Sequence, residues 1–357
     1  MFLLVASCAV AFGCSAQSDA RDPSPDSDGS GGSSTTSSSS AEAGVGGMGG
    51  ELNLGGSSTG GGAPDCSELP PSQVGSDVVL SPEFADFYSV FDLGQAPGVP
   101  GRLGGCVLKK GDPDTLLIAG DSEAFEGAIY EVKIKRDACK HIVGFEGNGV
   151  KVANAPNIDA NILYGANDVL VYPQWPVNTI SQHEASNMMQ AAATTPELGA
   201  IGILDAGSVS GLGFVPSYLG AAGGTRTLTW AQGFWYHLDL EFDGSVYQIT
   251  GAQQTATLPN GPGGFAYVPP ESPGFAESSI IMAEWSADKV AVYQSNDQGD
   301  PMVETRKDFF VTFPKPWGAY FDPESGDYLF LTWGATPPDR VYVVRGFVKP
   351  PPPEVPK

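Results

Sequence analysis

One recurring motif constrains the fold more than any other feature of the sequence. In this motif a glycine precedes a short apolar run, and it reads LGGCVLKK at 103–110, GLGFVPS at 211–217, GGFAYVPP at 263–270 and WGAYFDP at 317–323. The motif is marked by Gly105, Gly213, Gly264 and Gly318. Successive glycines in this series are 108, 51 and 54 positions apart. Because the first gap is twice the last, we expect a degenerate copy near residue 159, and NILYG stands at 161–165. A chain with such a period stacks similar units against one another.

Two further apolar runs follow the copies of the motif. The first reads TLLIAG at 115–120, DVLVYPQW at 168–175, TRTLTW at 225–230, SIIMAEW at 279–285 and DYLFLTW at 327–333, so that four of the five end in tryptophan. The second lies at 128–137, 235–244, 289–299 and 340–347. A less regular segment often precedes the next glycine. Four short strands in about 50 residues are typical of a β-propeller blade, and we predict an all-β fold.

The ends of the repeat region predict how the ring closes. Repeats begin near residues 105, 161, 213, 264 and 318, and the last has only three strands before the proline-rich end of the chain. Residues 84–94 (FADFYSVFDLG) form an apolar strand with no blade of their own. Pairing this strand with the last repeat removes an open sheet edge. We therefore predict a five-bladed β-propeller, with six blades as the alternative if residues 150–210 contain further strands.

The N-terminus is typical of an exported protein. Residues 2–13 are apolar or small, and twelve residues are too few to span a membrane but suit a signal peptide. Gly13 and Cys14 follow as in a bacterial lipobox, which predicts lipidation of Cys14, with Cys8 as a weaker candidate. A freely secreted protein with a cleaved signal is the alternative. We expect the protein outside the cytoplasm, either secreted or held by a lipid at a bacterial outer membrane or cell surface.

Composition divides the chain into four parts. After the signal at residues 1–14, residues 15–64 contain 13 Ser and 13 Gly in 50 positions and no aromatic residue. Such a segment cannot bury enough apolar area to order itself, and we expect a flexible linker with a reach of about 40 Å. The propeller is predicted for residues 65–348, and residues 349–357 form a proline-rich tail.

Three sequence stretches carry a resemblance to known proteins. These are GGFAYVPP, IIMAEWSADKVAVYQ at 280–294 and WGAYFDPESGDYLFLTWG at 317–334. They resemble a loose group of secreted bacterial β-propeller proteins of unassigned function, over roughly residues 85–347. The N-terminus resembles that of bacterial lipoproteins. The resemblance implies the fold and an extracytoplasmic setting, but no reaction and no catalytic residue.

Charge and cysteine content limit the partners. With 41 acidic and 18 basic residues the formal charge is −23, which disfavours nucleic acid and anionic surfaces as partners and leaves Ca²⁺ open as a bound ion. Recurrent Asp-rich turns suit hairpins, with a calcium site as the alternative. Beyond the signal, Cys66, Cys106 and Cys139 allow one disulfide and a free thiol, or three free thiols.

Candidate binding residues follow from the predicted ring. The usual functional surface of a propeller is the mouth of its channel, and loop positions there are predicted for Asn154, Asn161, Asn167, Asp168, Glu284 and Asp322. All six tryptophans lie in the repeats, which favours packing between blades. A stacking surface for sugars or aromatic ligands is the alternative, centred on residues 234–236.

The sequence is compatible with two functions. The first is a non-enzymatic, surface-tethered module that binds a small molecule, glycan or protein, or acts as a scaffold. The second is a propeller hydrolase or lyase acting on a sugar or lactone, with or without Ca²⁺. A channel mouth in which several carboxylates or amides converge favours the enzyme, whereas an apolar mouth counts against it.

Overall fold

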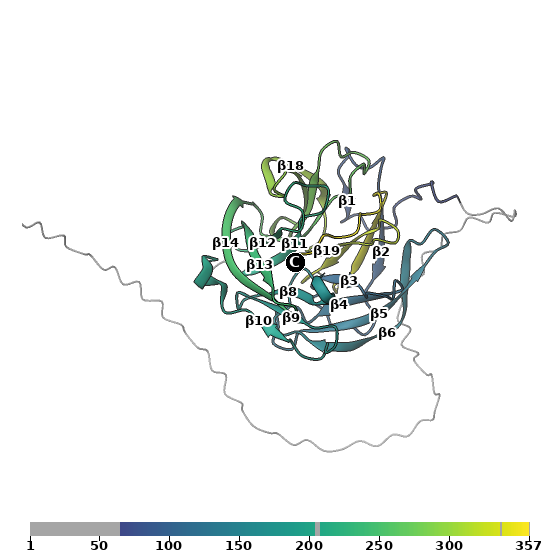
Figure 1. Cartoon of the computed structure of the whole chain (residues 1–357). Coiled ribbons are helices and arrows are strands. Elements are labelled where there is room, and N and C mark those ends of the chain that lie inside the picture. Colours follow the sequence, from purple (N-terminus) through teal and green to yellow (C-terminus); the bar gives the residue numbers. More distant parts are fainter. Residues whose placement is uncertain (1–64, 204–207, 336–337, 357) are drawn as a thin grey trace, which may run out of the picture. The chain divides into compact units, whose positions relative to one another are not determined.

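Five antiparallel sheets surround a common axis, as Figure 1 shows, and each sheet is one blade of a β-propeller. This computed structural model describes residues 65–203, 208–335 and 338–356. The predicted signal peptide and linker lie outside the described residues. Within them, the helical segments are three short 3-10 helices, η1 (Ala166–Asp168), η2 (Leu198–Ile201) and η4 (Trp285–Ala287), none of which could cross a membrane.

In blades 1 to 3 the strands follow their sequence order from the channel outward. Blade 1 contains β3 (Cys106–Leu108), β4 (Thr115–Gly120), β5 (Ala128–Arg136) and β6 (Ile142–Asn154). Blade 2 contains β7 (Leu163–Tyr164), β8 (Leu170–Gln174), β9 (Thr179–His183) and β10 (Ala193–Thr194). Blade 3 contains β11 (Val209–Phe214), β12 (Thr225–Thr229), β13 (Phe234–Phe242) and β14 (Tyr247–Thr257).

The last two blades include strands from the N-terminal side of the repeats. Blade 4 contains β15 (Pro262–Tyr267), β16 (Ser279–Glu284), β17 (Lys289–Ser295) and β18 (Pro301–Thr312), with β1 (Val79–Leu80) added at its outer edge. Blade 5 contains β19 (Pro316–Phe321), β20 (Tyr328–Thr332), β21 (Val341–Arg345) and β2 (Ser89–Gly94). The pairing of β2 with β21 confirms the predicted closure and the count of five blades.

The hydrophobic core lies between the blades. Five clusters of buried side chains occur, and each joins two neighbouring blades around the ring. The blade 4–5 cluster is rich in aromatics and includes Phe309, Phe330 and Tyr342. Central strands such as β4, β16 and β20 are buried along their whole length because both of their faces meet another blade. This explains why they read as unbroken apolar runs and not as alternating patterns.

The recurring glycines allow the inner strands to approach one another. A Cβ atom at Gly318 would lie 2.1 Å from the carbonyl oxygen of Gly104, and one at Gly264 would lie 2.5 Å from that of Trp317. In blade 3 it is Gly211 whose Cβ would meet a backbone carbonyl oxygen of the next blade, that of Gly263. Gly213, the glycine of the sequence motif, faces the ring of Phe265. The glycines are therefore required by close contact between blades near the axis.

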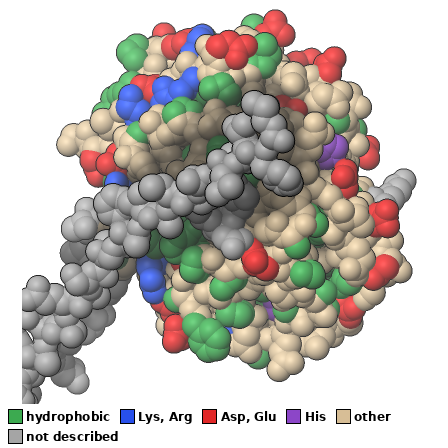
Figure 2. All heavy atoms as spheres, turned by 90° about the vertical axis from the view of Figure 1, so that its left-hand side faces the viewer, with side chains coloured by type: hydrophobic (Ala, Val, Ile, Leu, Met, Phe, Trp, Pro, Cys, Tyr) green, Lys and Arg blue, Asp and Glu red, His purple; other side chains and the backbone are tan. Residues whose placement is uncertain are grey.

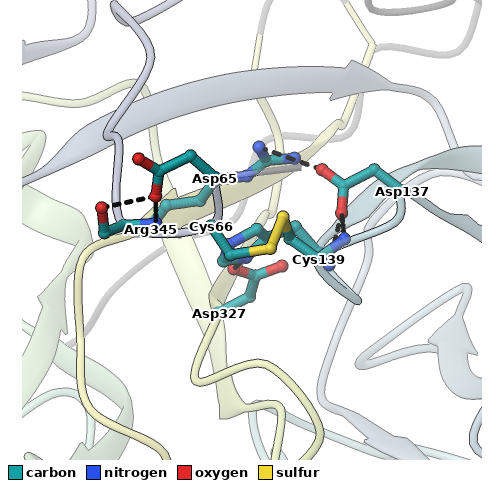
Figure 3. Close-up of a disulfide and its surroundings, with 8 residues drawn as sticks. Asp65, Cys66, Asp137, Cys139, Asp327 and Arg345 are labelled. Atoms are coloured by element: carbon teal, nitrogen blue, oxygen red, sulfur yellow. Dashed lines mark hydrogen bonds and ion pairs between the residues drawn. A yellow bond between two sulfur atoms is a disulfide. The ribbon is translucent and has the colours of Figure 1, made fainter. Parts of the chain in front are cut away.

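The segment before the repeats fastens three blades together. Besides the pairings of β1 and β2, Cys66 forms a disulfide with Cys139, which lies in the turn between β5 and β6 of blade 1. Figure 3 shows this bond beside an ion pair between Asp137 and Arg345, whose charged atoms are 3.4 Å apart. Cys106 is free and buried, so the structure has one disulfide and one thiol among the described cysteines.

Candidate functional site

A cavity of about 790 Å³ opens at the channel end where the inner strands finish. Its walls come from all five inner strands and the turns that follow them. Most of the wall is apolar or aromatic, as the lining side chains Val107, Leu163, Tyr164, Phe214, Tyr267, Tyr320 and Phe321 show. Burial raises the pKa of Tyr164, Tyr267 and Tyr320, so these hydroxyl groups stay protonated at all physiological pH values.

The floor of the cavity is the buried side chain of Asn161, which precedes β7. Its Nδ2 atom donates to the carbonyl oxygens of Ala319 at 3.2 Å and Phe265 at 3.4 Å. Its Oδ1 atom accepts from the backbone N–H of Leu212 at 3.2 Å. One amide thus links the inner strands of blades 3, 4 and 5 from blade 2. These bonds use most of the hydrogen-bonding capacity of the amide, so Asn161 has little left for a ligand.

Charged and amide side chains occupy the rim of the cavity. Asn167 and Asp168 lie in η1, the turn after β7, and both line the cavity. The Nδ2 atom of Asn167 donates to the carbonyl oxygen of Gly244 at 3.1 Å, while the carboxylate of Asp168 pairs with Lys110 of blade 1. Three predicted residues, Asn161, Asn167 and Asp168, therefore lie together at the mouth.

The C-terminal tail crosses this mouth. Pro350, Pro351, Pro353, Glu354 and Val355 line the same cavity as the inner strands, and Figure 1 places the end of the tail over the middle of the ring. We call residues 350–356 the strap. The hydroxyl of Tyr247 in blade 3 donates to the carbonyl oxygen of Pro356 at 2.9 Å and accepts from the N–H of Ala166 in blade 2 at 2.7 Å.

The other three predicted residues do not line the cavity. Asn154 ends β6, the outer strand of blade 1, and is exposed. Glu284 ends β16 and is fully buried, where it pairs with Arg306 at 2.5 Å and accepts from the hydroxyl of Tyr293 at 2.5 Å. Successive strands of a blade run in opposite directions. The second and fourth strands therefore end at the far side of the ring, which explains both placements.

Asp322 follows the inner strand β19, but its side chain points into the blade 1–5 interface. It is fully buried and pairs with Arg136 of blade 1 at 2.6 Å. It also accepts from the hydroxyl of Ser325 at 2.6 Å. Phe321, Pro323 and Glu324 line the cavity instead. Asp322 thus fastens two blades and is not presented to a ligand.

The opposite end of the channel carries an arc of aromatic rings. The arc consists of Trp175, Trp230, Trp285 and Trp333, each of which directly follows the second strand of its blade. Successive ring centroids are 6.3, 5.8 and 5.6 Å apart, and the rings meet edge to face. This geometry is that of mutual packing. Trp235 is also completely buried, against Phe265, which agrees with packing between blades.

In blade 1 no tryptophan follows the second strand, β4. Two carboxyl groups, those of Glu123 and Asp159, lie at this end of the channel instead. Asp159 is fully buried, and its Oδ1 atom accepts from the indole N–H of Trp317 at 2.7 Å, while its Oδ2 atom has no partner among the described residues. Burial, and then the charge of Glu123, raise the pKa of Asp159 well above its usual value. Burial raises the pKa of Glu123 to about 7.

Sequence reasoning missed Tyr247 and the strap as parts of the mouth. Tyr247 begins an outer strand, and nothing in its local pattern indicates that its hydroxyl reaches a turn of blade 2 and the tail. Four consecutive prolines at 350–353, separated from the last strand by four residues, indicated only a stiff segment that cannot join a sheet. Among the described residues, no group of three or more His, Cys, Asp or Glu could hold a metal ion, and Ca²⁺ binding stays a prediction.

Comparisons with known proteins give similarities of low identity. No family model matches the chain, and no curated protein does. The chain is similar to a solved luciferin-regenerating enzyme, with 12% identity over 81% of this chain and 97% of that one and a TM-score of 0.44. It is also similar to an auxiliary nutrient binding protein from Bacteroides thetaiotaomicron, with 12% identity, coverage of 70% and 69%, and a TM-score of 0.40. A third similar structure is the PQQ-bound aldose sugar dehydrogenase from Streptomyces coelicolor. It is 13% identical over 71% of this chain and 84% of that one, with a TM-score of 0.37.

Proposed function

We propose that this protein is a ligand-binding module whose site is the cavity at the channel mouth. The observation that carries the proposal is the lining of the cavity, which is apolar and aromatic in its walls, apart from tyrosine hydroxyls, and has its charged and amide side chains at the floor and rim. Its volume of about 790 Å³ falls within the range of about 300–1,000 Å³ that is common for small-molecule sites. Burial of apolar ligand surface against such walls supplies the binding free energy.

The binding site accepts an uncharged, largely apolar ligand surface. The polar groups at the floor and rim are mostly engaged within the protein, as the bonds of Asn161 and the pair of Lys110 with Asp168 show. A ligand that replaced these bonds would have to break contacts between blades. A ligand that packs against Phe214, Tyr164 and Tyr320 leaves them intact.

Binding of a neutral fluorescent probe, N-phenyl-1-naphthylamine, tests this proposal. We expect saturable binding, and we expect Phe214→Asp to weaken it about tenfold, which is the loss of roughly 1.4 kcal/mol of apolar contact. Phe125→Asp is the matched control, since Phe125 is 81% exposed and lies outside the cavity. Equal weakening by both substitutions, or no saturable binding, would refute the proposal.

We also propose that the module works outside the cytoplasm, tethered through a lipid on Cys14. The disulfide between Cys66 and Cys139 supports an oxidising compartment. The acidic surface in Figure 2 suits a soluble domain held above a membrane by a linker. Metabolic labelling with a fatty-acid analogue tests the tether, with Cys8→Ser as the control for Cys14→Ser. Loss of label in Cys14→Ser alone is expected, and unchanged label in both variants rejects it.

One observation favours the alternative of a hydrolase or lyase. Burial raises the pKa of both Asp159 and Glu123, that of Glu123 to about 7, and a carboxyl group that titrates near neutrality suits general acid–base catalysis. They lie away from the cavity described above. Turnover of a panel of lactones and glycosides, lost in Glu123→Gln, would support the enzyme over the binding module.

A further inference from the structure

We propose that the channel mouth is a receptor for extended, proline-rich peptides, and that the strap is a competitor built into the same chain. This inference rests on the proposed function, because it names the ligand class of the same cavity. The observation behind it is that the chain's own proline-rich segment already lies in the mouth, where five of its residues share the cavity with the inner strands.

The sequence of the strap defines the shape that the mouth accepts. Residues 350–353 are four consecutive prolines, and Pro356 follows Val355. Proline fixes its own φ angle and pushes the preceding residue into an extended conformation, so this run favours the polyproline II helix. Seven residues in that conformation span about 22 Å. The strap is separated by four residues from β21 of blade 5 and reaches Tyr247 of blade 3 at Pro356.

The mouth has the groups that polyproline II ligands need. Such ligands offer proline rings and unpaired carbonyl oxygens, and aromatic grooves bind them with ring faces and hydroxyl donors. Tyr164, Phe214 and Tyr320 supply half-buried rings on three different blades. The bond from Tyr247 to the carbonyl oxygen of Pro356 is one hydroxyl-to-carbonyl contact of this kind.

A second hydroxyl is free for a ligand. The oxygen of Tyr164 accepts from the N–H of Lys110 at 3.3 Å, and its own proton has no acceptor among the described residues. The hydroxyls of Tyr218 and Tyr267 already donate to the carbonyl oxygens of Val268 and Gly299. Tyr164 therefore marks the place where a peptide carbonyl would gain a bond that the strap does not make.

The contacts of the strap are weak enough for displacement. Pro352, Pro353 and Glu354 are exposed, and the backbone of residues 350–356 makes no bond to another backbone group in the described part of the chain. Segments with few buried contacts open at low free-energy cost. A tethered segment nonetheless competes at an effective concentration of about millimolar. A peptide in solution must therefore bind more tightly than the strap, or the strap must first be removed.

Electrostatics favour a basic partner peptide over the strap. The strap carries Glu354, and the rest of the cavity lining has three carboxylates against two lysines, on a protein of formal charge −23. These side chains are Asp112, Asp168, Glu324, Lys109 and Lys110. A proline-rich peptide with Lys or Arg in place of that glutamate would avoid the repulsion and gain from the surrounding field. We therefore assign basic, proline-rich segments as the preferred partner class.

Fluorescence anisotropy with labelled peptides tests the proposal directly. The probes are a peptide of residues 348–357, the same peptide with Glu354→Lys, and a version in which every proline is replaced by serine. The proteins are the full chain and a chain ending at Val348. We expect the shortened chain to bind the first peptide at least tenfold more tightly than the full chain does. The lysine peptide should bind more tightly still, and the serine peptide should not bind.

Two substitutions in the shortened chain test the contact itself. Tyr247→Phe should weaken peptide binding about fivefold, because one hydrogen bond is lost. Tyr88→Phe is the control, because its hydroxyl also donates to a proline carbonyl, that of Pro273, away from the mouth. Equal effects of the two substitutions contradict the assigned contact.

A full chain with four serines in place of residues 350–353 should bind the peptides as the shortened chain does. This variant controls for misfolding caused by the truncation.

The outcomes separate this inference from the proposed function. If the shortened chain binds the neutral naphthylamine probe but none of the peptides, the peptide inference is wrong and the apolar site remains. If it binds neither, both proposals fail. If full and shortened chains bind the peptide equally, the strap is no competitor.

Discussion

The two ends of the central channel differ in how they use the repeat. At the end opposite the mouth, which we call the closed end because the inner strands meet there, recurring glycines such as Gly264 and Gly318 allow these strands to touch. Tryptophans that recur after the second strands pack edge to face at the same end. At the mouth, each blade contributes a different turn, and the strap comes from outside the repeats. Positions that recur in this chain therefore build the ring, and positions that vary from blade to blade form the surface that we propose as its binding site.

The largest effect is expected for Gly318→Ala at the closed end. The new Cβ atom would lie 2.1 Å from a backbone carbonyl oxygen of blade 1, so two blades must separate. We expect a loss of about 4 kcal/mol in the free energy of unfolding. Urea denaturation measures it, with Gly144→Ala as the control because a Cβ there meets open space and its φ angle suits any residue. A loss below about 1 kcal/mol would contradict the close approach.

A smaller loss is expected for Asn161→Ala, at the boundary between the two ends. The substitution leaves the carbonyl oxygens of Phe265 and Ala319 and the N–H of Leu212 without their partners. We expect a loss of about 2–3 kcal/mol in the free energy of unfolding. The naphthylamine probe should still bind, since the apolar walls remain. Loss of probe binding without loss of stability would instead make Asn161 a ligand contact.

The closed end should make stability depend on pH. Burial raises the folded-state pKa values of Asp159 and Glu123, the latter to about 7, so their contribution is complete below pH 4 and is lost as pH rises through the folded values. We expect a decrease of about 1 kcal/mol between pH 5 and pH 8. Asp159→Asn should flatten this profile in urea titrations at several pH values. A profile that is the same in Asp159→Asn and the unaltered chain would contradict the assignment.

The smallest effect on stability is expected at the mouth. A chain ending at Val348 loses the bond between Tyr247 and Pro356 and a few half-buried contacts, while all five core clusters keep their residues. We expect its free energy of unfolding to change by less than about 1 kcal/mol. Calorimetry with and without the strap measures the change. A loss comparable to that of Gly318→Ala would make the strap part of the ring.

The sequence predicted the ring well because the ring depends on repeated contacts. Gly264 and Gly318 recur since each blade meets the next in the same way. Of the predicted strand at 84–94, residues 89–94 form β2 and complete blade 5, because an open edge is costly, whereas residues 84–88 precede the strand. The mouth was predicted only in part. Asn167 and Asp168 line the cavity since they follow an inner strand, whereas Glu284 ends a second strand and lies at the other side.

The position of the strap could not be predicted from the sequence, for a physical reason. Its position depends on a single tertiary hydrogen bond, from Tyr247 to Pro356 across 109 residues of sequence, and on the hollow left by five unlike turns. Neither leaves a periodic signal. The proline run indicates stiffness, but not the surface on which a stiff segment rests.

Photo-crosslinking of an apolar ligand tests most directly which end of the channel binds. A neutral diazirine probe, irradiated with the full and shortened chains and mapped by mass spectrometry, should modify residues 161–168, 211–218 and 319–324. Labelling should increase when the strap is absent. Labelling concentrated on Trp175, Trp230, Trp285 and Trp333 would contradict the account, since it would place the binding surface at the end that the repeats close.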